Sequence, residues 1–427
     1  LHLYLMGSSS RGRYPVVFNG GIWTWNRDVR QWTHPHHWNE QQAYWCLCAS
    51  NHPELMQPYL DTYWRLVPKA EEHAARRGFR GALLWNEMHD YAGRMVDWER
   101  PSFVYNWTPA SQIGQYFWQY YLTTGDEEFL RERAYPFMAK AAEVYLQYAK
   151  RDEAGRLSFH PASPFESESG NDFRDTTADL AMIRASFPAL IRASSILGVD
   201  SDKRAEWQGM LDSLPEFAYR IDPEHGEMTA VGWEKDGRTV ANRPGTEYGF
   251  AENTAPVFPH GIVGLAHKGS RLFEAIARRV RTHPTFGNAI IPTAVVAARL
   301  GMAGEAWERL RLTIRQLQHF PQGLFYNIDH WHYLSPHAEK VPDAQMACQR
   351  GYITDRASRY RGIRTGDRRV DTPTQPFVQC GLEPMGILAH AVNEMLLQSH
   401  DGTIRVFPAT PAAWNAAFRL KIGRAHV

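Results

Sequence analysis

Cysteine is scarce in this chain of 427 residues. The four cysteines (Cys46, Cys48, Cys348 and Cys380) are too few for a disulfide framework. Cys46 and Cys48 stand two apart in a predicted helix, so they face different directions and are expected in the core rather than at a metal. Apolar runs stay short of the roughly 18 residues that a bilayer requires. The net charge of +1 gives no electrostatic reason to expect nucleic acid or a membrane surface as a partner.

Aromatic residues, by contrast, are abundant. Tryptophan, tyrosine and phenylalanine make up 13% of the chain. They cluster in GGIWTWNRDVRQWTHPHHW (20–38) and NWTPASQIGQYFWQYY (106–121). Aromatic rings combine an apolar face with a polar edge, which suits a pocket for sugar rings, although the same rings also fill large cores. We expect Trp38 and Trp107 to contact a sugar.

Helical periodicity dominates the chain from Asn39 onward. Apolar residues recur at spacings of three and four in about ten to twelve segments. These segments are paired and separated by long loops, without the alternation of strands and helices that marks α/β folds. We therefore predict an all-α domain over residues 39–400, with its site among the long loops. Residues 1–38 are rich in Gly, Ser, Pro and Trp and predict an irregular linker segment.

The two ends of the sequence give less information. The first residue is Leu1 and no signal-like segment follows it, so the location of the protein in the cell cannot be read. Residues 401–421 resemble short strands, and we expect them to leave the helical domain as the extended start of a truncated β domain. The last six residues, IGRAHV (422–427), resemble the translation of a sequencing adapter, so we expect the genuine sequence to stop near Lys421.

A single carboxylate stands out in the stretch PFVQCGLEPMG (376–386). Glu383 lies in apolar surroundings, directly before Pro384, which suits the first turn of a helix. Charged side chains are rarely buried unless they are paired or used in chemistry. A carboxylate at the positive end of a helix dipole is also a common cap. Glu383 is therefore either a helix cap or one half of a functional pair.

A second carboxylate, Glu166, lies in the long loop LSFHPASPFESESG (157–170), directly after Pro164 and Phe165. Two isolated carboxylates in partly apolar settings suit acid–base cleavage of a glycosidic bond. One of them must keep its proton near neutral pH, which partial desolvation favours, and the other must activate a water. If the reaction inverts the anomeric centre, the two carboxyl groups should face each other about 6.5–9.5 Å apart.

Five stretches resemble glycoside hydrolase family 95 and occur in the order seen in that family. The family comprises inverting α-L-fucosidases and related α-L-galactosidases, and the resemblance covers roughly residues 15–418. It implies an (α/α)6 barrel, an oligosaccharide or polysaccharide substrate, no cofactor, and a secreted or periplasmic location. The stretches are HHWNEQQAYW (36–45), YYLTTGDEEFLRERAYPFMAKAAEVYL (120–146), PASPFESESG (161–170), TTADLAMIRASF (176–187) and NEMLLQSHDGTIRVFPATPAAW (393–414).

The resemblance assigns roles to individual residues. Glu166 falls on the glutamate of the family's Ser-Pro-Glu-Asn stretch, which implies the general acid. Glu383 falls on the family's catalytic aspartate, which implies the general base. His37 and Asn39 fall on two asparagines that orient this base and its water in the family. Thr177 and Asp179 match a Thr-Met-Asp stretch, for which we predict a structural role.

The chain also departs from the family at its site. Glutamate replaces aspartate at the base, and His37 replaces an amide, so we expect a pH dependence that asparagine would not give. The family's sugar-holding His-Arg-His-x-Ser-His stretch corresponds to YGFAENTAPVFPHG (248–261). Glu252 and Asn253 stand where serine and histidine are expected, and His260 follows. These three residues predict a rebuilt sugar pocket with an altered or broadened hexose preference.

Three functions fit the sequence. The first is the inverting exo-glycosidase. The second is a polysaccharide lyase on an α/α toroid, because tyrosine, histidine and an arginine-rich loop (356–369) are available. The third is a non-catalytic relative that binds carbohydrate. We expect no metal, because the histidines of HPHH (34–37) and DHWHY (329–333) do not have the spacing of a helical zinc site.

Overall fold

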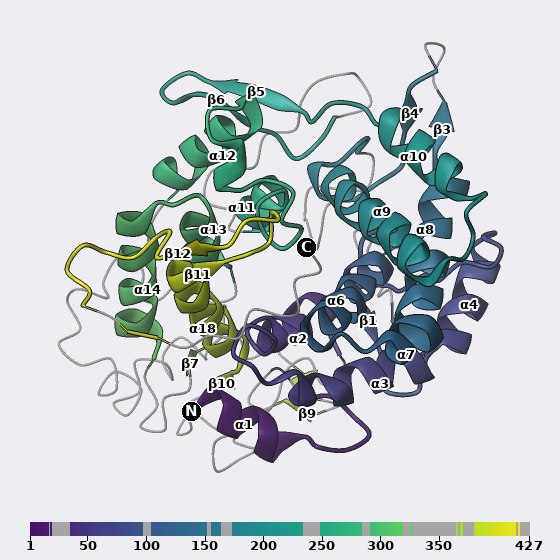
Figure 1. Cartoon of the computed structure of the whole chain (residues 1–427), viewed down its shortest axis with the longest axis horizontal. Coiled ribbons are helices and arrows are strands. Elements are labelled where there is room, and N and C mark those ends of the chain that lie inside the picture. The colour runs from purple at the N-terminus through teal and green to yellow at the C-terminus, as the bar shows by residue number, and fades with distance from the viewer. Residues whose placement is uncertain are drawn as a thin grey trace.

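Helices in two concentric rings make up most of this protein, as Figure 1 shows. Along the chain that the structure describes, each inner helix except the last is followed by one or two outer helices, and each inner helix lies beside the next around a central axis. This arrangement confirms the predicted all-α (α/α)6 toroid. The computed structural model describes residues 1–16, 18, 35–96, 104–151, 155–163, 173–233, 248–283, 291–318, 325–326, 364–365, 368–369, 380–415 and 417–418.

The inner ring surrounds the central axis. Its helices carry much of the buried aromatic and aliphatic core, which is continuous with the inward faces of the outer helices. Neighbours in this ring pack directly, as α18 does against α2 and α13. The inner helices are α2 (His37–Tyr44), α6 (Pro109–Thr124), α9 (Thr177–Leu197), α11 (Tyr248–Thr254), α13 (Thr293–Arg299) and α18 (Glu383–Leu396).

The outer ring covers the inner one. The short helix α7 (Glu127–Phe129) continues through a π-helical turn (Leu130–Ala134) into α8. Pro136, the second residue of α8, has no backbone N–H to donate to this turn. Short 3₁₀ turns occur at Pro53–Met56 and Leu265–His267. The outer helices are α1 (His2–Ser9), α3 (Gln57–Arg65), α4 (Val67–Arg76), α8 (Tyr135–Tyr148), α10 (Arg204–Asp212), α12 (Arg271–Thr282) and α14 (Ala303–Leu317).

Strands within the described ranges form only two-stranded antiparallel sheets, in agreement with the predicted helical class. The longest of these sheets pairs Tyr219 with Thr229 and Asp222 with Gly226. The pairs are β1 (Met88–His89) with β2 (Met95–Val96), β3 (Lys150–Arg151) with β4 (Leu157–Ser158), β5 (Tyr219–Asp222) with β6 (Gly226–Thr229), β7 (Phe325–Tyr326) with β10 (Cys380–Gly381), β8 (Arg364–Thr365) with β9 (Arg368–Arg369), and β11 (Leu397–Gln398) with β12 (Arg405–Val406).

Local signals in the sequence set the limits of α9. Thr176 caps its N-terminus by accepting a hydrogen bond from the backbone N–H of Asp179, and Gly198 ends it in the left-handed conformation. The carboxylate of Asp179 in turn accepts hydrogen bonds from the hydroxyls of Thr176 and Tyr145. Thr177 donates to the carbonyl of Ala230. These contacts give Thr177 and Asp179 the structural role that was predicted.

Helix α9 also has the length and apolar character of a membrane span, and is alone in this among the helices that the structure describes. It packs between α8 and α10, and Asp179 is buried in its first turn. Arg184 and Arg192 interrupt its apolar sequence. Its composition is that of a helix in the core of the toroid.

Two predictions about the ends of the chain were wrong. Residues 2–9 form helix α1 rather than irregular chain, because Leu5 and Met6 are buried within a segment that is otherwise rich in small and polar residues. Among the described residues after Gly402, the segment 405–409 does not leave the toroid as extended chain. The backbone N–H of Phe407 donates to the carbonyl of Leu396, and β12 pairs with β11.

Candidate active site

Glu383 begins α18 in the inner ring and is fully buried. Its Oε1 accepts a hydrogen bond of 3.2 Å from the Nδ2 of Asn39, which lies 344 positions away in the sequence. Oε2 makes no hydrogen bond within the described part of the chain. The carboxylate therefore contacts the neighbouring helix α2 of the inner ring, and Leu382, the N-cap residue of α18, makes no side-chain hydrogen bond.

Burial dominates the electrostatics of Glu383. Removal from water raises the pKa of this carboxyl from 4.5 to about 8, and the Asn39 amide and nearby backbone N–H groups oppose the shift only in part. At neutral pH Glu383 is therefore largely protonated. A general base at this position becomes ionised as the pH rises through about 8.

Helix α2 is polar in sequence, yet all of its residues are buried. Its sequence, HWNEQQAY, contains a tryptophan, a tyrosine and an alanine besides three amides, a carboxylate and a histidine. Buried polar side chains need hydrogen-bond partners, so such a helix is costly unless its polar groups serve a purpose. Helix α2 packs against α18 in the inner ring, and it presents Asn39 to Glu383.

Hydrogen bonds to its neighbours determine the tautomer of His37. The Nε2 of His37 lies 2.7 Å from the Oε1 of Gln112, which also accepts from Gln41. The amide nitrogen of Gln112 donates to Thr108. Nε2 therefore carries the proton, and Nδ1 is an acceptor without a partner among the residues described.

The burial of His37 contradicts the prediction that this residue makes activity depend on pH. Desolvation lowers the pKa of His37 to about 4, even though the hydrogen bond to Gln112 favours the charged form. The ring is therefore neutral throughout the physiological range. Gln112 is its hydrogen-bond partner, whereas Asn39 is the partner of Glu383.

The predicted sugar contacts on the opposite side of the ring are also buried. Glu252 and Asn253 belong to α11, and His260 follows that helix. Each side chain has one polar atom, namely Glu252 Oε1, Asn253 Oδ1 or His260 Nε2, that makes no hydrogen bond to the described residues. Burial raises the pKa of Glu252 to about 8 and lowers that of His260 to about 3. The other ring nitrogen of His260 lies 3.2 Å from Gln115.

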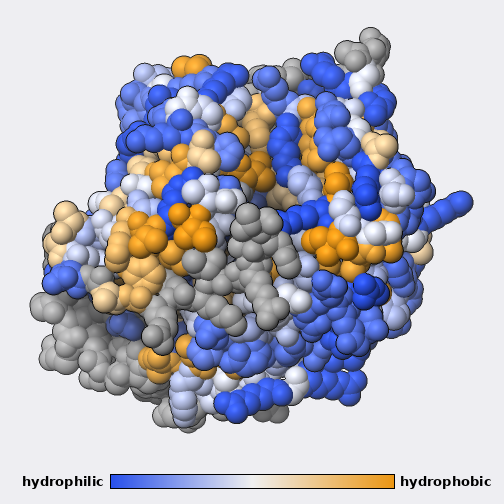
Figure 2. All heavy atoms as spheres, in the orientation of Figure 1, coloured by the Kyte–Doolittle hydropathy of each residue, from blue (hydrophilic) through white to orange (hydrophobic). Residues whose placement is uncertain are grey.

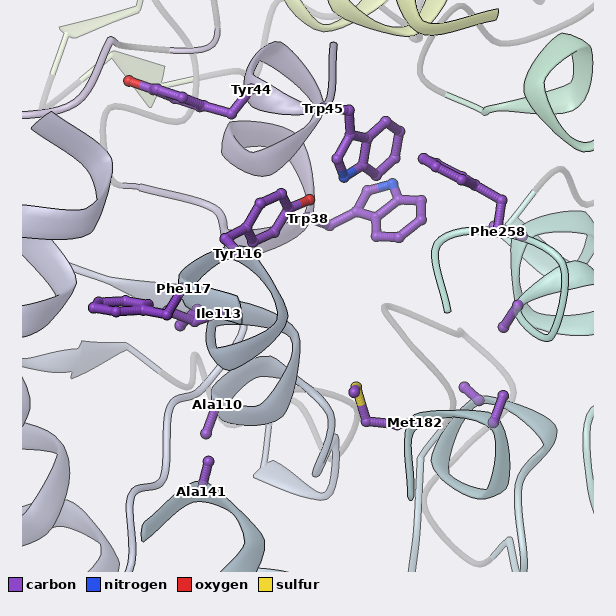
Figure 3. Close-up of a cluster of buried hydrophobic side chains, with 14 of the residues drawn as sticks. Trp38, Tyr44, Trp45, Ala110, Ile113, Tyr116, Phe117, Ala141, Met182 and Phe258 are labelled. Carbon is purple, nitrogen blue, oxygen red and sulfur yellow. The ribbon is translucent and has the colours of Figure 1, made fainter. Parts of the chain in front are cut away.

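An aromatic cluster adjoins Asn39. Figure 3 shows Trp38, Trp45 and Phe258 close to one another between α2 and the segment that follows α11. Trp38 and Trp45 meet edge to face at 5.4 Å between ring centroids, and Trp45 meets Phe258 at 4.5 Å. In Figure 2, hydrophobic residues are exposed around the middle of the face, whereas hydrophilic residues cover much of its upper and right-hand edges.

Trp107, one of the two tryptophans expected to contact a sugar, is packed among other aromatic side chains. Its ring packs against Tyr148 at 4.3 Å and against Phe79 at 5.7 Å, and its indole N–H donates to the carbonyl of Pro161. Tyr148 donates to the same carbonyl. This packing gives Trp107 a structural role near Pro161, and its predicted sugar contact stays a prediction.

Glu166 itself lies outside the described residues, as do the histidines of DHWHY, so its predicted position opposite Glu383 is not tested. The residues on either side of its loop are paired, because Ala162 and Phe173 form an antiparallel bridge. The buried thiols of Cys46 and Cys48 are free, as predicted, and burial raises their pKa values to about 12 and 11.

Comparison with known proteins agrees with this arrangement. Residues 2–334 match the model of the glycosyl hydrolase family 95 catalytic domain. The chain belongs to glycosyl hydrolase family 95. It is 26% identical to alpha-L-fucosidase 2 of Arabidopsis thaliana over 211 residues, which are 47% of this chain and 25% of that protein. It is 22% identical to kojibiose hydrolase of Flavobacterium johnsoniae over 180 residues, which are 42% and 26% of the two chains.

This chain matches only about a quarter of the length of each of these two relatives. Solved structures support the toroid. A wild-type glycosidase structure has a TM-score of 0.54 at 10% identity, and the match covers 92% of this chain and 94% of the other. A variant of a glycosidase gives a TM-score of 0.53 at 11% identity with the same coverage.

The sequence analysis did not single out three residues that contact α2 in this candidate site. Glu87, Gln112 and Gly386 contact α2 from three different segments, yet each looks unremarkable in its own stretch of sequence. The signal that could have found their region is the polar character of HWNEQQAY, which requires buried partners wherever it packs.

Replacing Asn39 with alanine should lower turnover more than substrate affinity. The amide holds one oxygen of Glu383 in place, and orientation acts mainly in the transition state, so we expect kcat to fall by about 10- to 100-fold. Losing the donor should also raise the pKa of Glu383, which moves the rise in activity to higher pH. Steady-state kinetics across pH measure both effects.

Asn393→Ala is the matched control for this variant. Asn393 lies on the same helix as Glu383 and donates to Ser50 at 3.1 Å, so its loss should leave both kcat and the pH profile unchanged. Equal losses in the two variants would mean that Asn39 matters only for folding.

Proposed function

We propose that this protein is an inverting exo-glycosidase in which Glu383 is the general base and Glu166 the general acid. The observation that carries the proposal is the hydrogen bond between Asn39 and Glu383. Two polar side chains from opposite ends of the sequence meet in the inner ring of a family 95 toroid, and one oxygen of the carboxylate makes no hydrogen bond to the residues that the structure describes. That is the arrangement required to hold a base and leave it an acceptor for a water proton.

The proposed reaction is one displacement. Oε2 of Glu383 takes a proton from water, and the water oxygen forms a bond with the anomeric carbon. As the bond from this carbon to the glycosidic oxygen breaks, Glu166 gives its proton to the leaving oxygen. The water attacks from the face opposite the leaving group, so the configuration inverts. The acceptor Nδ1 of His37 is suited to bind the second proton of the water.

The proposed sugar contacts are the ring of Trp38 and the polar side chains of Glu252, Asn253 and His260. Sugar hydroxyls would match the buried polar atoms of the last three, and a sugar with another pattern of hydroxyls would leave those atoms unpaired. Glu252 can donate as well as accept, because its raised pKa keeps it protonated near neutral pH. These features support a terminal hexose or deoxyhexose as substrate.

Two sugar classes are the main candidates. An α-L-fucoside or a related α-L-galactoside follows from the resemblance and from the Arabidopsis relative. The replacement of the family's sugar-holding histidines, together with the two relatives named kojibiose hydrolase, supports kojibiose or another α-glucoside as the second. The rebuilt segment 248–261 is the feature that would decide between them.

A substrate screen tests the proposed function. The protein is incubated with nitrophenyl α-L-fucoside, α-L-galactoside, β-L-arabinoside, α-L-rhamnoside and α-D-glucoside, with kojibiose, and with plant and mucin oligosaccharides. We expect a new reducing end from at least one of them, and proton NMR of the first product should show the inverted anomer. Retained configuration would overturn the inverting mechanism.

The same screen separates the alternatives. An unsaturated product detected by its ultraviolet absorbance would favour the lyase. Sugar binding by a folded protein without any turnover would favour the non-catalytic relative. Glu166→Gln should abolish hydrolysis, because glutamine cannot donate the proton, whereas Glu168→Gln in the same loop should retain it. Equal activity in both variants would exclude Glu166 as the general acid.

A further inference from the structure

The start of α2 is held by a residue from another segment. The residue at its N-cap, His36, makes no side-chain hydrogen bond to the helix. Instead, the backbone N–H of His37 donates to the carbonyl of Glu87 at 2.7 Å, and the N–H of Trp38 donates to the Oε1 of Glu87 at 2.7 Å. Glu87 therefore satisfies two of the N–H groups that a helix leaves unpaired at its beginning. Asn39 is the next residue.

The other oxygen of Glu87 is also bound. Oε2 accepts a hydrogen bond of 3.3 Å from the Nδ2 of Asn106, and Glu87 and Asn106 are both almost completely buried. The Oδ1 of Asn106 accepts from both the backbone N–H and the hydroxyl of Thr108. This double contact fixes the orientation of the Asn106 amide, so its NH₂ group must face Glu87.

A second path from the same group reaches the side chain of His37. Thr108 accepts from Gln112, and Gln112 accepts from the His37 ring. The buried network therefore holds the beginning of α2 by its main chain through Glu87 and by its first side chain through Gln112. An antiparallel bridge between His36 and Met88 lies alongside. None of these contacts reaches Glu383, which meets α2 only at the next residue, Asn39, among the hydrogen bonds of the described residues.

We propose that Glu87 is a positioning residue, which caps α2 from the β1 segment and thereby fixes Asn39 against Glu383. The effect of Glu87 on turnover rests on the proposed function. The geometric content of the proposal, the coupling of Glu87 to Glu383 through the start of α2, is independent of any substrate. A displacement of about 1 Å at a reacting group can cost roughly 100-fold in rate, so a cap that moves the helix start matters for catalysis.

Glu87→Gln is the test variant. The glutamine oxygen can still accept from Trp38, but its NH₂ group then faces the NH₂ group of Asn106, which Thr108 prevents from turning. The double variant Glu87→Gln with Asn106→Asp restores the side-chain hydrogen bonds described above. The amide introduced at position 87 donates to the carboxylate introduced at position 106, and that carboxylate still accepts from Thr108. The formal charge of the pair is unchanged, and a rescue therefore reports the hydrogen bonds themselves.

Kinetics give the first readout. We expect Glu87→Gln to lower kcat by about 10- to 100-fold while KM stays within a few-fold, and the double variant to recover most of kcat. Wild-type kcat in Glu87→Gln would overturn the proposal. So would a folded double variant that is as slow as the single one, because restored hydrogen bonds should restore the position of Asn39.

The titration of Glu383 gives a readout without turnover. The difference in unfolding free energy between each protein and the same protein carrying Glu383→Gln is measured against pH. This difference changes between the unfolded and the folded pKa of Glu383, so the midpoint of the change moves whenever the folded pKa moves. Glu87→Gln should move this midpoint to higher pH by weakening the Asn39 contact, and the double variant should return it.

An unmoved midpoint overturns the positioning role. If wild type hydrolyses nothing but the midpoint moves, the proposed function fails while the positioning role stands. If Glu87→Gln does not fold, the double variant alone must show wild-type kcat and midpoint, and a failure to do so overturns the proposal.

Discussion

Glu383→Gln should nearly abolish hydrolysis and at the same time stabilise the protein at alkaline pH. The loss of the base should lower kcat by about 10²- to 10⁴-fold, since glutamine cannot take a proton from water. The stabilisation has a separate cause. Burial raises the pKa of Glu383 from 4.5 to about 8, so the folded protein must hold a charge out of water once the carboxyl ionises.

The sign of the pH effect follows from proton binding. Between pH 4.5 and about 8 the folded state keeps a proton on Glu383 that the unfolded state releases, so wild-type stability falls as the pH rises through this window. Glutamine removes this loss. The variant should therefore gain stability over wild type from pH 4.5 upward and reach a plateau above about pH 8, on the order of 4 kcal/mol. Urea unfolding at pH 5, 7 and 9 measures the difference.

Glu394 is the matched contrast on the same helix and should behave in the opposite way. Burial favours its neutral form, but Arg299 at 2.8 Å, together with His400 and His390, outweighs burial and lowers the pKa of Glu394 to about 2. Glu394→Gln leaves the buried Arg299 unpaired, which should destabilise the protein by about 3–5 kcal/mol at neutral pH. This loss should shrink as the pH falls from 4.5 toward 2. A Glu383→Gln difference that is constant across pH would show that Glu383 is ionised in the folded protein throughout.

Gly386→Ala is expected to disrupt both stability and turnover. Gly386 lies one turn after Glu383 in α18, against the backbone of α2. A Cβ at this position would lie 2.2 Å from the carbonyl oxygen of Gln42 and 2.9 Å from the Cα of Ala43. Both are main-chain atoms and cannot rotate away, so the two helices must separate. Overpacking of this kind costs about 1–3 kcal/mol, and the separation falls where Asn39 meets Glu383.

The same substitution in α10 provides the control. Gly209 is also inside a helix, but its added Cβ would meet nothing within 4 Å. Gly209→Ala should stabilise the protein by about 0.5–1 kcal/mol, because alanine favours the helix and restricts the unfolded chain. Thermal unfolding and kcat of both variants give the comparison. A stable, active Gly386→Ala protein would mean that the close approach of α2 and α18 is not needed for the site.

The sequence by itself determined the helical class, and it identified Asn39 and Glu383 as candidate site residues. Periodicity at three and four residues predicted the helices, and local caps such as Thr176 and Gly198 set their limits, because these interactions span only a few residues. The isolated Glu383 before Pro384 also indicated a candidate functional residue, whereas the polar character of the helix from His37 to Tyr44 was a signal that the sequence analysis did not use. A buried polar group without a local partner indicates a partner elsewhere, whichever residue that is.

Only the tertiary structure decided how these groups behave. The neutral state of His37 and the raised pKa of Glu383 come from desolvation, which sums over neighbours from every part of the chain. Glu87 caps α2 from a segment that lies 49 positions after Trp38. Phe407 pairs with Leu396, although the sequence predicted that this part of the chain leaves the toroid. No local periodicity encodes such pairings, because they depend on which surfaces the closed ring of helices brings together.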